Sequence, residues 1–191
     1  MLYKPDWEET RDRFCAWWEG ELIDRCAIAV VAPRADAPNE EPPPMPKDPI
    51  KRWTDLDYIA QCNDYYFRRT LFGGEALPIW SGGYPGHVCL PTFLGCPINL
   101  DFVTGWWDPI FEDKDDWDYR SLQIDKTSMW WDFGIRLLER AAKEAQGKSF
   151  PSIGAFGACG DVLSALRGTM GLLYDTVDCP DRVREAEIHL M

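Results

Sequence analysis

A glycine-rich segment at residues 81–87 ends in His87, one of only two histidines in this 191-residue chain. An imidazole changes its charge near neutral pH, so a histidine in such a loop can act as a general acid or base. The sequence shows no partner group for this histidine, and the alternative is a loop residue without a catalytic role. His87 is therefore a candidate catalytic residue.

Two charged residues stand at the ends of predicted elements and could also contact a substrate. Arg34 comes just after the apolar run 26–32, and its guanidinium could bind a carboxylate through two parallel hydrogen bonds. The alternative for Arg34 is an ion pair with the acidic surface. Asp161 opens a predicted helix, where its side chain would most simply cap the first turn. A catalytic role is the second interpretation of Asp161.

Aromatic residues form the third group of candidates. The ten tryptophans include the doublets Trp17-Trp18, Trp106-Trp107 and Trp130-Trp131. Neighbouring side chains on one helix point in different directions, so some of these indoles should line a cleft or an interface. Trp80, Tyr84 and Trp107 are candidate substrate-binding residues that could form a platform for a flat ligand. The alternative is that these aromatic side chains pack against helices on the outside of the fold.

Composition excludes several classes of protein. The formal charge is −12, and the basic residues are scattered among more numerous acids, which argues against a nucleic-acid partner. No apolar run is long enough to cross a membrane, and the charged opening residues lack a secretory pattern, so we expect a cytoplasmic protein. The seven cysteines form no C-x-x-C pair and are expected to be reduced thiols.

The elements that must position the candidates alternate between helices and strands. The predicted helices span residues 6–19, 54–72, 126–146 and 161–177, and the predicted strands span 26–32, 75–80, part of 98–111, and 150–155. The first strand is apolar throughout, which is typical of a strand buried on both faces. Six prolines make residues 35–50 an irregular loop. This alternation predicts a mainly parallel α/β fold.

The first helix carries the clearest start signal. Asp6 is followed three residues later by Glu9, which is the spacing of a capping box. The helical period then places Trp7, Phe14 and Trp18 on one expected buried stripe.

Several segments, taken in order, resemble uroporphyrinogen decarboxylase-like proteins. The longest is GDVLSALRGTMGLLYDTVDCPDRV at 160–183, and the others are KPDWEETR at 4–11, IDRCAIAV at 23–30, FGGEALP at 72–78 and FLGC at 93–96. The similarity runs over nearly the whole chain. It implies a (β/α)8 TIM barrel, of which this chain would supply about four βα units preceded by an N-terminal helix. Because a complete barrel needs roughly 250 residues, residues 1–191 are expected to be the N-terminal half of one such domain, or a truncated reading frame.

The resemblance implies three alternative functions. Relatives of this kind include the haem-pathway decarboxylase, corrinoid-linked methyltransferases and, more remotely, cobalamin-independent methionine synthase. The decarboxylase aspartate after the second strand has no counterpart here, and its tyrosine of the fourth unit falls near Leu163 or Ser164. We therefore expect a methyltransferase-type enzyme that uses a corrinoid or a thiol. A tetrapyrrole decarboxylase and an inactive barrel fragment or binding module are the alternatives.

The resemblance also implies where substrates and cofactors would bind. In barrels the catalytic groups lie on loops after the strands, so Arg34, Tyr84 and His87 should converge with Cys159 or Asp161. The methyltransferases hold zinc through His-x-Cys and a distant Cys, which would lie in the missing half. His87-Val-Cys89 with Cys96 copies that spacing at a different position, and we expect no metal site in this chain. The expected partners are a small molecule, a tetrapyrrole or corrinoid protein, and a second copy or the missing half.

Overall fold

The computed structural model describes residues 1–83, 86–112, 118–152, 157 and 159–191. The chain divides into two compact units, which we call the first and the second unit. The first comprises Met1–Lys47, Thr54–Gly83 and Leu137–Ile153, and the second comprises Asp48–Trp53, Tyr84–Arg136 and Gly154–Met191. None of the helices in the described ranges combines the length and the apolar content that crossing a bilayer requires.

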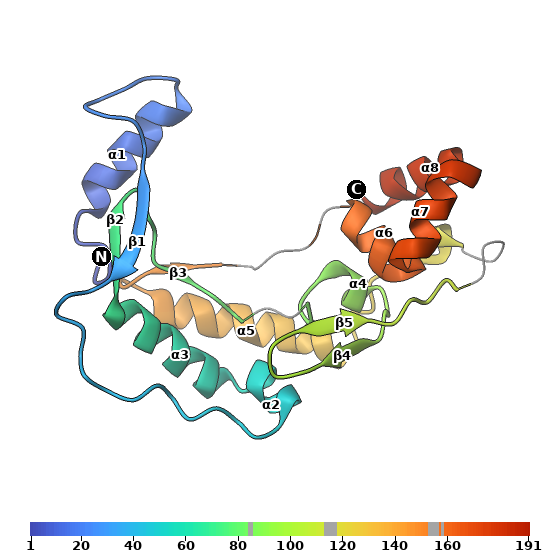
Figure 1. The fold of residues 1–191 in the computed structure, drawn as a ribbon, viewed down its shortest axis with the longest axis horizontal. Helices are drawn as coiled ribbons and strands as arrows, with labels where there is room; N and C mark the ends of the chain where they lie inside the picture. The colour runs from blue at the N-terminus through green and yellow to red at the C-terminus, as the bar shows by residue number, and fades with distance from the viewer. Residues whose placement is uncertain (84–85, 113–117, 153–156, 158) are drawn as a thin grey trace. The chain divides into compact units, whose positions relative to one another are not determined.

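Helices and strands are both present, as the sequence predicts (Figure 1). The helices are α1 (Trp7–Trp18), α2 (Pro49–Thr54), α3 (Leu56–Arg69), α4 (Leu90–Phe93), α5 (Met129–Ala145), α6 (Cys159–Arg167), α7 (Thr169–Asp178) and α8 (Pro180–Leu190), with a 3-10 turn, η1, at Tyr119–Ser121. The strands are β1 (Ala29–Pro33), β2 (Thr70–Gly74), β3 (Ile79–Trp80), β4 (Ile98–Leu100), β5 (Gly105–Trp107) and β6 (Phe150–Pro151).

The described strands form three separate two-stranded sheets rather than one mainly parallel sheet, and they close no barrel. β1 pairs antiparallel with β2, β4 pairs antiparallel with β5, and only β3 with β6 is parallel. The expectation of mainly parallel strands is therefore wrong for two of these three pairs. Helix α3 ends at Arg69, before its predicted end at residue 72, and the residues that follow form β2, which pairs with β1. Thr70 is extended and donates its hydroxyl hydrogen to the Tyr66 carbonyl.

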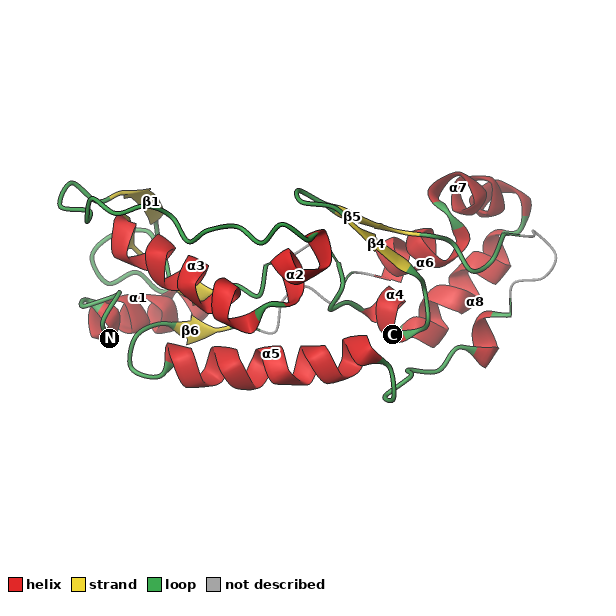
Figure 2. Ribbon diagram, turned by 90° about the horizontal axis from the view of Figure 1, so that it is seen from below, coloured by secondary structure: helices red, strands yellow, loops and turns green. Residues whose placement is uncertain are grey.

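The first unit packs α3 and the C-terminal part of α5 beside the strand pair β3–β6 (Figure 2). Asp55 starts α3 by accepting hydrogen bonds from the backbone of the next turn. In α5, Leu137, Ala141 and Ala145 are buried at four-residue spacing. Ion pairing of Arg140 with Asp57 links the two helices. This part of the helical pattern is confirmed.

The second unit combines the hairpin β4–β5 with α4 and the three helices α6, α7 and α8. Its core contains Cys96, Val162 and Leu166 in one cluster and Tyr119, Leu163, Val183 and Ala186 in another. The single helix predicted at 161–177 is broken into α6 and α7. Gly168 causes the break because it has a positive φ of 79°, outside the helical range.

Candidate functional site

The second unit holds a pocket of about 490 Å³ whose wall includes two of the predicted site residues, Trp107 and Asp161. Strand β5, Pro109 after it and the start of α4 supply one part of the wall, and α6 with the start of α7 supplies another. The volume is within the range that takes a small-molecule ligand. The chemically relevant lining residues are Cys89, Trp106, Trp107, Asp161, Ser164 and Thr169.

The indole of Trp107 is fixed by two successive hydrogen bonds. Its Nε1–H donates to the Thr92 hydroxyl at 2.9 Å, and that hydroxyl donates to the Gly86 carbonyl at 3.0 Å. Gly86 has a φ of 97°, and a Cβ on it would lie 2.5 Å from the indole ring. Because residue 86 has no side chain, the ring can pack against its backbone, which leaves the position of Trp107 in the pocket wall defined.

Asp161 lies inside the first turn of α6, which begins at Cys159. It is therefore not the N-cap residue, and the capping interpretation is wrong. Its side chain is exposed, and it forms no ion pair with any residue in the described part of the chain. Ser164 and Thr169 share a hydrogen bond of 2.9 Å between their hydroxyl groups across the α6–α7 junction. The pocket thus combines aromatic surface, one carboxylate and two hydroxyls.

His87 lies in a different environment from the one predicted for a catalytic acid or base. Its side chain is 1% exposed, and its ring packs on Trp130 and Phe133 with centroid distances of 5.7 and 5.4 Å. Neither ring nitrogen has a hydrogen-bond partner of normal geometry among the described residues. Burial lowers the pKa of His87 to about 4, and the Trp53 backbone opposes that shift. The ring is therefore neutral at pH 7 and is shielded from water.

Two further candidates belong to the first unit. Arg34 is exposed and forms a bidentate pair with Asp36 at 2.9 and 2.7 Å, so the ion-pair interpretation of Arg34 describes its contacts. Trp80 is 3% exposed and contributes to the core. Tyr84 lies outside the described residues. Of the predicted site residues, the structure brings Trp107 and Asp161 to one pocket, and Arg34, Trp80 and His87 do not line it.

Cys96, the distant cysteine of the His-x-Cys spacing, has backbone partners in the fold. The Cys96 thiol donates to the carbonyls of Asp108 and Ala165, at 3.2 and 3.4 Å. Burial raises the pKa of this thiol to about 11, which disfavours the thiolate that zinc requires. Within the described ranges, no group of three His, Cys, Asp or Glu side chains is arranged to hold a metal ion.

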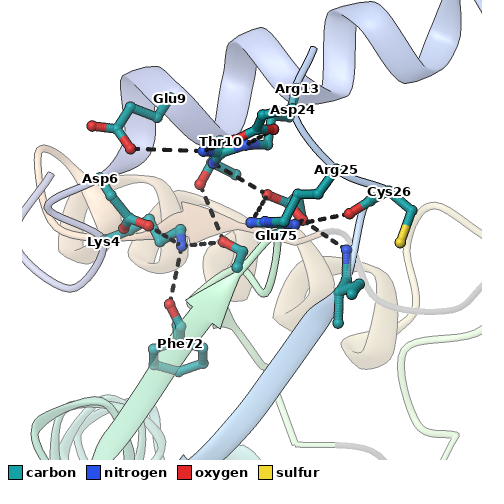
Figure 3. Close-up of polar contacts among 12 residues, drawn as sticks. Lys4, Asp6, Glu9, Thr10, Arg13, Asp24, Arg25, Cys26, Phe72 and Glu75 are labelled. Carbon is teal, nitrogen blue, oxygen red and sulfur yellow. Dashed lines mark hydrogen bonds and ion pairs between the residues drawn. The ribbon is translucent and has the colours of Figure 1, made fainter. Parts of the chain in front are cut away.

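A buried polar cluster in the first unit was not predicted (Figure 3). Lys4 is fully buried, and its ammonium group donates to the carbonyls of Phe72 and Gly74 and to the Asp6 carboxylate. Asp6 therefore binds Lys4 instead of capping α1. The cluster joins the N-terminal segment to β2, and its groups use one another as partners, which gives it a structural role.

Glu75 is the second centre of this cluster. It accepts two hydrogen bonds from Arg25, at 2.7 and 2.9 Å, and one from the backbone N–H of Ile28, while Arg13 lies 3.5 Å away. The Arg25 hydrogen bond, with the Ile28 N–H and the charges of both arginines, lowers the pKa of Glu75 to about 2 against the opposing effect of burial. The cluster thereby ties the segment before β1 to the end of β2.

Sequence reasoning missed Thr92, Ser164 and Thr169. Single hydroxyl residues carry no motif, so only the folded contacts reveal them. Comparisons of the chain with known protein families, with curated proteins and with solved structures find no match.

Proposed function

We propose that this chain is part of a methyl-transfer enzyme of the uroporphyrinogen decarboxylase-like type, and that the pocket of the second unit holds the methyl donor. One observation carries this proposal. The longest segment of resemblance, residues 160–183, supplies Asp161, Ser164, Gly168 and Thr169 to the wall of the pocket. The acceptor would be a corrinoid or a thiol.

The pocket residues have separate roles in this proposal. The N–H of Trp107 is already bound by Thr92, so its ring face is the part available to a ligand. Such a face stacks on flat or methyl-rich groups. The Asp161 carboxylate and the Ser164 and Thr169 hydroxyls would orient the polar end of the donor.

Methyl transfer requires above all that the donor and the acceptor are held in the correct relative position. A methyl group leaves its donor without the bonding electrons, which stay on the leaving atom, and it forms a new bond to the acceptor nucleophile. The pocket would hold the donor so that the carbon faces the acceptor in line, which lowers the entropic cost of the encounter. No step is assigned to zinc, because Cys96 is bound by backbone carbonyls.

We further propose that residues 1–191 form the N-terminal half of a barrel. The parallel pair β3–β6 is the arrangement that a barrel uses. β1 pairs with β2 along one edge, and its Val30 and Val31 side chains stay about half exposed, which leaves surface on which further elements could pack. The missing half, or a second copy, would cover it.

The charge of the pocket favours methyl transfer over decarboxylation of uroporphyrinogen. Uroporphyrinogen is a polycarboxylate, so its binding calls for Arg or Lys side chains. Among the described residues that line the pocket there is no Lys, Arg or His. A binding module without activity remains the second alternative, and it would use the same pocket without turnover.

The experiment is a methyl-transfer assay with the purified chain. Methylated amines and methoxy compounds serve as donors, and cob(I)alamin or a simple thiol serves as the acceptor, with products followed by mass spectrometry. We expect turnover that falls at least about tenfold in Asp161→Asn and in Trp107→Leu. Asp181→Asn is the matched control, because Asp181 lies in the first turn of α8 in the same unit. Absence of methyl transfer, or production of decarboxylated porphyrinogen, would contradict the proposal.

A further inference from the structure

The charged groups of the pocket restrict what it can bind. Asp161 is the one charged side chain among the described lining residues, and it has no ion-pair partner in the described part of the chain. A negative group without a counter-ion beside a pocket attracts a positively charged ligand.

The aromatic wall has the same preference. Trp107 is held with its ring in the wall, and the neighbouring Trp106 is 51% exposed. The face of an indole carries partial negative charge and binds ammonium groups better than any other aromatic side chain does. Quaternary ammonium groups are favoured in particular, because they donate no hydrogen bonds and lose little hydration on entering such a site.

The remaining polar groups do not reverse this preference. Ser164 and Thr169 share one hydrogen bond, so one hydroxyl hydrogen is used between them, the other can still donate to a ligand, and both oxygens keep lone pairs. The charge of the whole chain is −12, which attracts cations over a longer range.

We propose that the pocket binds an organic cation, a methylated ammonium compound. This inference rests on the proposed function and names the class of its methyl donor. The cationic group would lie between the indole face of Trp107 and the Asp161 carboxylate. When the acceptor nucleophile takes the methyl group, the C–N bond breaks and its electron pair stays on nitrogen, which leaves a neutral amine.

The test compares three ligands of one shape by isothermal titration calorimetry. They are choline, its neutral isostere 3,3-dimethylbutan-1-ol, and the anion 3,3-dimethylbutanoate. We expect choline to bind about tenfold more tightly than the alcohol, from a cation–π contact and one ion pair, and the anion to bind most weakly. Equal affinities of choline and the alcohol, or no binding of choline, would overturn the inference.

Variants of Asp161 test whether its carboxylate causes the preference for choline over the neutral alcohol. Asp161→Asn should lower the ratio of choline to alcohol affinity severalfold, whereas Asp161→Glu and the control Asp181→Asn should retain it. A ratio that is unchanged in a folded Asp161→Asn variant would overturn the inference. Failure of this inference can be distinguished from failure of the proposed function. Choline binding without methyl transfer contradicts only the function, and methyl transfer from neutral methoxy donors without cation preference contradicts only this inference.

Discussion

The Thr92 hydroxyl group fixes the position of Trp107 in the pocket wall. It accepts a hydrogen bond from Trp107 and donates one to the Gly86 carbonyl, and it is itself buried. The sequence could predict that Trp107 lines a cleft, because neighbouring tryptophans cannot all point into one core. It could not predict Thr92, since a lone threonine beside a proline has no distinguishing pattern.

Replacement of the Thr92 hydroxyl should leave the Trp107 ring less firmly positioned in the pocket wall. In Thr92→Val the Trp107 N–H loses its acceptor, and a buried unpaired group costs about 1–3 kcal/mol. We expect a corresponding loss of stability in urea unfolding, together with weaker choline binding. Thr92→Ser keeps the hydroxyl and should retain most of the affinity. If Thr92→Val binds choline as the wild type does, the hydrogen bond does not position the indole.

His87 makes stability depend on pH. Its pKa is about 4 in the folded chain and near 6.5 when exposed, so the unfolded state takes up the proton first. Stability is therefore full above pH 6.5 and declines as the pH falls toward 4. The expected loss between pH 7 and pH 5 is about 2 kcal/mol. His87→Phe should remove this loss in unfolding experiments, and His189→Phe, which changes an exposed histidine, should leave it in place.

At the scale of elements, helical periodicity is the most informative signal in the sequence. α1, α3 and α5 lie where the pattern predicts them. Which face of a helix is buried is less predictable. In α1, Trp18 is 82% exposed, while Thr10 is buried against the Gly74 carbonyl. Strand pairing could not be derived from the sequence, since an apolar run gives a strand but not its partner.

The junction of α6 and α7 depends on the backbone of Gly168. Its φ is 79°, and a Cβ there would lie 3.2 Å from Pro109. We expect Gly168→Ala to destabilise the chain by about 1–2 kcal/mol and to weaken ligand binding, because Ser164 and Thr169 flank the junction. Gly160→Ala is the control within α6, where the nearest atom to a Cβ is 3.8 Å away. It should leave stability unchanged or raise it. Equal effects of both changes in thermal unfolding would contradict this account.

At the scale of the whole molecule, the first unit leaves much apolar strand surface uncovered. Val30, Val31 and Leu71 are each about half exposed, although a strand buried on both faces was predicted for residues 26–32. The apolar pattern was correctly identified, and the strand that it forms is exposed instead of buried on both faces.

Such a surface should cause self-association. We expect the sedimentation coefficient of the chain to rise with concentration, and Val31→Lys to reduce this rise by placing a charge on the strand. Val103→Lys is the control, because Val103 is 85% exposed between β4 and β5 in the second unit. A wild-type chain that stays monomeric at high concentration would contradict the expectation.

Choline binding at the Trp107–Asp161 pocket can be followed through the indole N–H signals of the chain. In a ¹⁵N-labelled sample, choline is titrated while the tryptophan Nε1–H resonances are followed and assigned by substitution. If choline binds there, we expect saturable shifts for Trp106 and Trp107 and no shift for the exposed Trp18. In Asp161→Asn we expect this response to be lost. Shifts confined to other tryptophans, or a response that persists unchanged in Asp161→Asn, would contradict it.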